Sequence, residues 1–139
     1  MVVWLVAVFV IQKILNKEMA GLKTVQLEIN GSKIEAEVAD TFFSRMRGLS
    51  GRENLGENKG MLFVFGSPAV QSFWMKGMKF PIDIIWINND EVVGFAENAP
   101  TPDGLNIPSF SPPSAVDKVL ELNAGSVQRI GIKKGDEIK

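Results

Sequence analysis

The chain has 139 residues, of which 45% are hydrophobic and 22% charged, enough for one hydrophobic core and too apolar for a disordered chain. Fifteen basic residues against sixteen acidic ones give a net charge of −1, which argues against binding nucleic acid by bulk charge. Cysteine and histidine are both absent. Their absence excludes disulfides, thiol nucleophiles, Ser-His-Asp catalysis and ordinary zinc sites, so we expect no metal and no cofactor.

The chain opens with an apolar run. Every residue from Met1 to Ile11 is apolar, and a helix from Met1 to Leu15 would be roughly 22 Å long at about 1.5 Å per residue. That is short of a bilayer core of roughly 30 Å and closer to the hydrophobic region of a signal peptide. No cationic stretch precedes the run, and Lys13 and Lys17 follow it, which is atypical of exported proteins.

A break in composition at residues 16–18 separates this run from an orderly amphipathic pattern. We predict that residues 1–20 are a signal peptide or membrane anchor and that residues 21–139 fold without them as one domain. The alternative is that the amino-terminal segment is a strand or helix buried in the core.

A β-hairpin is predicted after the break. Apolar and polar residues alternate over 24–29 and again over 33–38, as in half-buried strands. Asn30-Gly31 lies between them and suits the positive φ angles of a tight turn.

A short helix follows, which Asp40 or Thr41 can cap and Gly48 can end. Its apolar residues share one face at helical spacing, and its basic residues would lie on the exposed side. The apolar residues are Phe42, Met46 and Leu49, and the basic ones Arg45, Arg47 and Arg52.

The middle and the end of the chain are rich in strand signals. Residues 61–65 and 80–87 are intensely apolar and predict central strands, and residues 91–98 return after a turn as a second hairpin. A proline-rich loop covers 100–113, and a strand over 118–122 precedes a short helix over 124–130 and a final short strand. We therefore predict an all-β fold with one or two short helices, a compact sandwich or barrel of jelly-roll type.

The ordered landmarks of this pattern resemble the domain of unknown function 192 family over residues 24–139. They are Arg47-Gly48-Leu49, Gly60-Met61-Leu62-Phe63, Phe73-Trp74-Met75-Lys76, Pro81-Ile82-Asp83-Ile84-Ile85, Glu97, Pro100, the stretch 119–125 and the stretch 131–136. The resemblance implies a single compact β domain, often preceded by a signal peptide or anchor, and no established activity. The chain departs from the family at Lys76-Gly77-Met78, where Lys-Asn-Thr is usual, and at Ser50, where methionine is common.

Trp74 and Met75 are the first candidates for a ligand site. They precede an apolar strand, and ordinary core packing explains both residue types. The functional alternative makes Trp74 the wall of a binding site, where its flat face suits a sugar ring or another planar group.

Acidic residues inside apolar strands are the second group of candidates. Asp83 and Glu121 each lie between apolar neighbours, where a charge costs several kcal/mol unless it is paired, and Glu97 ends its strand. Each acid is either a local structural anchor or part of a cleft. We predict that Trp74 and the three acids surround one concavity. Carboxylates gathered there would suit glycoside hydrolysis or a hard cation such as calcium.

Arg45, Arg47 and Arg52 form a candidate basic patch, which is either a solvated face or a dock for an anionic ligand or lipid headgroup. We expect an extracytoplasmic domain, secreted or anchored through Met1 to Leu15, that binds a small ligand or protein partner as a monomer without catalysis. We assign no catalytic residue and expect no nucleic acid partner. The alternatives are a carboxylate-dependent hydrolase acting on a saccharide-like substrate, a structural accessory of a membrane complex, and a cytoplasmic location.

Overall fold

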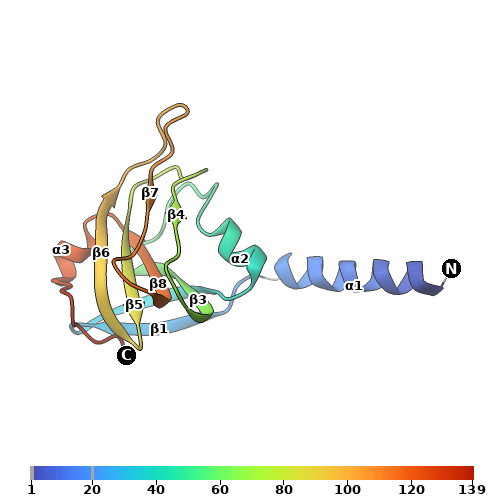
Figure 1. Ribbon diagram of the computed structural model, residues 1–139, viewed down its shortest axis with the longest axis horizontal. Helices are drawn as coiled ribbons and strands as arrows, with labels where there is room; N and C mark the ends of the chain where they lie inside the picture. The colour runs from blue at the N-terminus through green and yellow to red at the C-terminus, as the bar shows by residue number, and fades with distance from the viewer. Residues whose placement is uncertain (1, 20) are drawn as a thin grey trace.

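The computed structural model describes residues 2–19 and 21–139 (Figure 1). Helix α1 (Val2–Met19) contributes no strand to either sheet, and the side chains of residues 3–14 are all exposed. Among the described residues no helix combines the length and the apolar character needed to cross a membrane.

The rest of the chain forms a six-stranded sheet, a two-stranded sheet and two short helices. The strands are β1 (Thr24–Ile29), β2 (Ser32–Ala39), β3 (Lys59–Ala69), β4 (Phe73–Trp74), β5 (Ile82–Asn88), β6 (Glu91–Ala99), β7 (Ser109–Phe110) and β8 (Val116–Asn123), and the helices are α2 (Phe42–Arg47) and α3 (Ser126–Ile130). The large sheet has the order β1-β2-β3-β8-β5-β6, parallel only between β2 and β3, and β4 pairs with β7.

The β-rich fold is confirmed, and the six strands form a mixed sheet whose edges are β1 and β6. Strand pairing does not close this sheet into a barrel, so the jelly-roll or barrel architecture stays a prediction. The carboxyl-terminal residues reach both edges. The backbones of Lys139 and Glu28 exchange hydrogen bonds of 2.8 and 3.1 Å, and Ile138 N–H donates to Asp90 O at 2.8 Å. The strand predicted at the end of the chain is reduced to an isolated bridge between Glu91 and Glu137.

Both predicted hairpins are present. Asn30 and Gly31 turn the chain between β1 and β2 with φ angles of 51° and 78°. Asn89 and Asp90 do the same between β5 and β6 with φ angles of 49° and 61°. Positive φ at both central residues matches the right-handed twist of the flanking strands. Dipeptides that adopt positive φ easily therefore predict such turns from the sequence.

Two hydrophobic clusters cover the two faces of the large sheet. Ile84 and Trp86 of β5 belong to the first cluster, which also holds Leu49 and Met78 beyond the strands. Ile85 and Ile87 belong to the second, which holds Val127 of α3. Because successive side chains of a strand point to opposite faces, β5 and β8 at the centre of the sheet are buried on both sides.

Helix α2 lies with its apolar side outward, and the prediction that Phe42 and Met46 share a buried face with Leu49 is wrong. Phe42 and Met46 are exposed, whereas Leu49 beyond the helix is buried. Polar groups of α2 are held on the domain side instead. Ser44 is buried in a capping box with Thr41. The capping box stabilises the first turn of the helix, and the hydrogen bond from Arg45 to Val64 O of β3 ties α2 to the sheet in this orientation.

Removal of residues 1–20 should leave a cooperatively folded domain, because both sheets and both hydrophobic clusters lie within residues 21–139. The fragment should give a dispersed two-dimensional amide NMR spectrum and a single thermal unfolding transition. A collapsed spectrum would show that the amino-terminal segment completes the core.

Candidate functional site

A pocket of about 340 Å³ opens beside α2 and β4. We call it the Glu121 pocket. Its aromatic lining comes from Phe42, Phe63, Phe65, Phe73 and Trp74. Its polar lining comes from Arg45, Arg47, Ser50, Gln71, Ser72 and Glu121, and Met46, Gly48, Leu49 and Met78 complete it. The volume lies within the range of small-molecule sites.

Glu121 is the buried acid of this pocket. It lies on β8, with Met61 of β3 and Ile84 of β5 as its cross-strand neighbours. The residue is 7% exposed, and within residues 21–139 its carboxyl group has no hydrogen bond or ion pair. Burial raises its pKa from 4.5 to about 8. The side chain is therefore a neutral carboxylic acid at pH 7, able to donate as well as accept a hydrogen bond.

Trp74 forms an exposed part of the lining, with 58% of the residue accessible. The preceding Phe73 packs edge-on against Phe63, with ring centroids 5.1 Å apart, and against Trp86 at 5.6 Å. Since side chains alternate along a strand, anchoring Phe73 in the core turns Trp74 to the other side of β4. The Lys76 ammonium lies 4.9 Å from the centroid of the Trp74 ring, a cation–π contact.

The three arginines of the predicted basic patch have different roles. Arg45 donates to Asp40 O at 2.8 Å and Val64 O at 3.0 Å, and its guanidinium lies over the Phe65 ring. Arg47 is exposed on the pocket lining and, in the part of the chain that the structure describes, its guanidinium has no hydrogen bond or ion pair.

Arg52 lies outside the Glu121 pocket. It forms a bidentate ion pair with Glu37 of β2, with one contact at 3.1 Å and a second, shorter one. The basic patch therefore divides into two arginines of the pocket and one partner of β2.

The prediction that Trp74, Asp83, Glu97 and Glu121 surround one concavity is wrong. The pocket brings Trp74 and Glu121 together, and neither of the other acids lines it. Asp83 is the cross-strand partner of Leu122, the residue after Glu121, so its side chain points to the opposite face of the sheet. Glu97 is exposed on β6. Met75 is 1% exposed within the first hydrophobic cluster, as core packing requires.

Asp83 is a structural anchor on that opposite face. The residue is fully buried, and both carboxylate oxygens accept backbone hydrogen bonds of 2.8 Å, from Asn98 N–H and from Val127 N–H. Asn98 has a positive φ of 51° where β6 departs from regular pairing. Val127 lies in the first turn of α3, whose cap Gly125 supplies no side-chain hydrogen bond. Asp83 thus ties β5 to both segments.

Several pocket residues were missed by sequence reasoning. Phe63 and Phe65 are two apart on β3 and so share a face, and this spacing was the available signal. Gln71, Ser72 and Met78 carry no comparable signal, because loops bring them to the pocket. Among the described residues no group of three or more acidic side chains is arranged to hold a metal ion.

Asp83→Ala should lower the free energy of unfolding by about 2–4 kcal/mol, because it leaves two backbone N–H groups, of which that of Val127 is buried, without their acceptors. Glu97→Ala, on the neighbouring strand and exposed, is the control and should change stability by less than about 0.5 kcal/mol. Urea unfolding of the two variants measures both values. Equal stability in both would contradict the anchoring role of Asp83.

The stability of the chain should depend on the proton of Glu121. The unfolded chain releases this proton near pH 4.5, whereas the folded chain keeps it to about pH 8. The folded state therefore binds more protons between these values, and the free energy of unfolding falls as pH rises through this window, by on the order of 5 kcal/mol in total.

Glu121→Gln removes the titrating group and keeps a neutral side chain of similar size. Its free energy of unfolding should not decline in this way. The variant should therefore become increasingly stable relative to the parent chain as pH rises from about 5 to about 8. Urea unfolding at several pH values compares them. Parallel pH profiles would contradict the buried neutral acid.

Comparison with known proteins identifies the family. The family model described as "Uncharacterized ACR" matches residues 25–139. A solved structure of a protein of unknown function from Novosphingobium aromaticivorans has 32% identity and a TM-score of 0.76, over 85% of this chain and 86% of that one. A second, described as a "putative transcription regulator" from Sinorhizobium meliloti, has 29% identity and a TM-score of 0.79, over 86% and 95%. No curated protein matches. The family match spans most of the chain, which therefore belongs to the domain of unknown function 192 family.

Proposed function

We propose that this protein is a non-catalytic binding domain that works outside the cytoplasm and takes a small planar ligand into the Glu121 pocket. The single observation that carries the proposal is the Glu121 carboxyl group, buried in the lining of an open pocket with no protein partner among the described residues. Buried polar groups in folded proteins are nearly always hydrogen-bonded. A ligand that accepts a hydrogen bond would satisfy this one.

The rest of the lining defines the ligand further. The aromatic side chains of Phe63, Phe65 and Trp74 favour a flat, largely apolar body. Arg47 is a cation without a protein partner within the described residues, and it suits a carboxylate or another anionic group. The favoured ligand is therefore a planar organic anion of one or two rings, which a site of about 340 Å³ can hold.

Binding is favoured over hydrolysis by the distribution of the acids. Hydrolysis of a glycoside by carboxylates takes a pair of them around the scissile bond. Of the described residues that line the pocket, Glu121 is the one with a carboxyl group, and Asp83 faces the other side of the sheet. The Sinorhizobium meliloti relative is described as a "putative transcription regulator", which suggests DNA binding for that protein. The net charge of −1 does not support DNA binding by this chain.

The proposed location rests on the amino-terminal segment. The apolar run of residues 1–11 precedes the domain, and the exposed side chains of residues 3–14 take no part in its hydrophobic clusters. An exposed apolar segment of this kind suits export or attachment to a membrane.

Titration of residues 21–139 with indole-3-acetate, followed by amide NMR, tests the proposal. Shifts should concentrate at Trp74, Glu121 and the α2 backbone, and Trp74→Ala should abolish them. N-acetylglucosamine and calcium, added separately, test the saccharide and cation alternatives. Shifts confined to residues outside the pocket, or the absence of shifts with indole-3-acetate, would contradict the proposal.

The affinity should also depend on pH. A ligand that accepts a hydrogen bond from neutral Glu121 should bind about tenfold more weakly at pH 9 than at pH 7, because the neutral fraction falls by that factor around a pKa of about 8. Glu121→Gln, which keeps a donor, should bind without this dependence, whereas Glu97→Gln should behave as the parent chain does. The same pH dependence in Glu121→Gln would show that another group controls binding.

A further inference from the structure

We propose that the exposed apolar side of helix α2 contacts the surface of an anionic lipid bilayer. This surface, which we call the α2 face, consists of Phe42, Phe43 and Met46. The inference rests on one part of the proposed function, the attachment of residues 1–20 to a membrane, and it does not require a ligand, although Phe42 and Met46 also line the Glu121 pocket.

In helix α2 the apolar side faces solvent and the polar side faces the domain, the reverse of the usual arrangement. Met46 lies three positions after Phe43 and four after Phe42, so the three side chains share one side of the helix, and they are 64% (Phe42), 56% (Phe43) and 57% (Met46) exposed. Ser44, on the domain side, is only 6% exposed. A surface helix normally buries its apolar side, and clustered large apolar groups facing solvent indicate a surface that meets a partner or a membrane.

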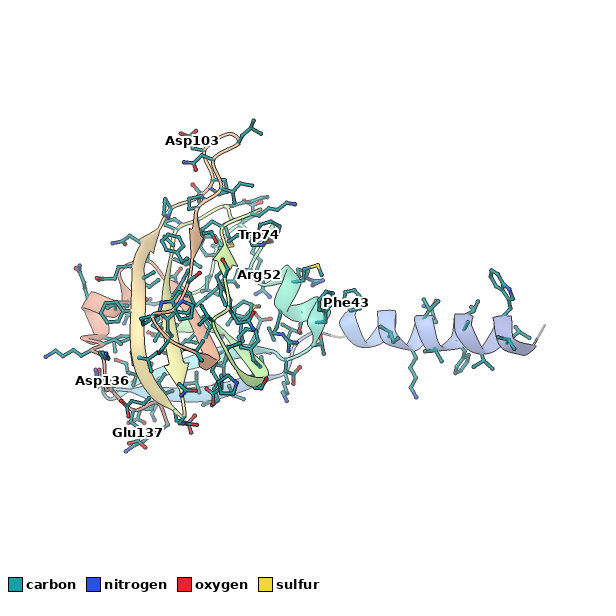
Figure 2. The ribbon with its side chains drawn as sticks, viewed as in Figure 1. Phe43, Arg52, Trp74, Asp103, Asp136 and Glu137 are labelled. Carbon is teal, nitrogen blue, oxygen red and sulfur yellow. The ribbon has the colours of Figure 1, made fainter. Side chains whose placement is uncertain are left out.

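The fold places this face beside the membrane-directed segment. At the start of β1, Lys23 O accepts a 2.9 Å hydrogen bond from Val38 N–H at the end of β2. The chain therefore leaves α1 and enters α2 at the same end of the same hairpin, with α2 beginning three residues after β2. Figure 1 shows α1 next to α2, and Figure 2 shows Phe43 on the side of α2 from which α1 extends. A bilayer that holds α1 lies within a few residues of the α2 face.

The charges around the α2 face suit anionic headgroups. Arg45 and Arg47 lie in the last turn of the helix, and Arg47 has no partner within the described part of the chain. The nearby acids are already paired, Asp40 with Lys23 at 3.3 Å and Glu37 with Arg52. Arg45 is held toward the domain by Val64 O and the Phe65 ring, so Arg47 is the cation beside the α2 face. Apolar side chains beside a basic residue are typical of interfacial helices on anionic membranes.

Depth-dependent quenching on the full-length chain tests the inference. The chain has no cysteine, so Met46→Cys and Leu105→Cys each give one site for an environment-sensitive NBD label. Met46 is largely exposed, so the label should not disturb the fold, and Leu105 is a fully exposed control on the loop that carries Asp103 in Figure 2. The vesicles contain phosphatidylcholine and phosphatidylglycerol, with or without brominated lipid.

The label at Met46 should shift to the blue and be quenched by brominated lipid, whereas the label at Leu105 should not respond. Arg47→Glu should reduce the quenching at Met46, and replacing phosphatidylglycerol by phosphatidylcholine should do the same. A chain that floats with the vesicles but leaves Met46 unquenched overturns the α2 contact and preserves attachment through residues 1–20. A chain that does not float overturns both. A blue shift without lipid quenching shows that protein covers the face and also overturns the inference.

Discussion

The position of β8 between β3 and β5 is the constraint on which the rest of the structure depends. Both backbone edges of β8 are used by antiparallel partners, and its side chains are covered on both faces. A residue at position 121 can therefore reach water only through a gap in the covering layer. The Glu121 pocket is that gap, between α2 and β4. The central place of β8 thus accounts for the burial of Glu121, and the pocket is where its side chain meets the surface.

The two acids in the central strands show how local partners decide the chemistry of similar sequences. Asp83 and Glu121 both lie between apolar neighbours, and both are buried. Both carboxyl oxygens of Asp83 accept hydrogen bonds from backbone N–H groups, those of Asn98 and Val127. Glu121 meets none among the described residues, and burial alone raises its pKa. One acid thus holds the fold together, whereas the other is available to a ligand.

Helix α2 links the two proposed surfaces. Phe42 and Met46 belong to the lining of the Glu121 pocket and also to the α2 face. The outward turn of this helix is costly in isolation, because it leaves large apolar groups in water. The hydrogen bond from Arg45 to Val64 O and the contact of its guanidinium with the Phe65 ring, both on β3, hold it there. A helix held with its apolar side outward fits a molecule whose function lies at its surface rather than in its core.

The sequence by itself determined the local elements and the family. Period-two alternation and the Asn30-Gly31 turn predicted the first hairpin, because side-chain direction and positive φ are properties of neighbouring residues. Apolar runs rich in β-branched residues located the central strands, and apolar neighbours on both sides marked Glu121 as a candidate buried acid. Only the tertiary structure decided which residues share a site. Strand order and register place Asp83 and Glu121 on opposite faces. Helix α2 lies with its apolar side outward, where Arg45 can donate a hydrogen bond to Val64 O on β3. Sequence spacing cannot predict contacts between distant segments, and the pocket is formed by such contacts.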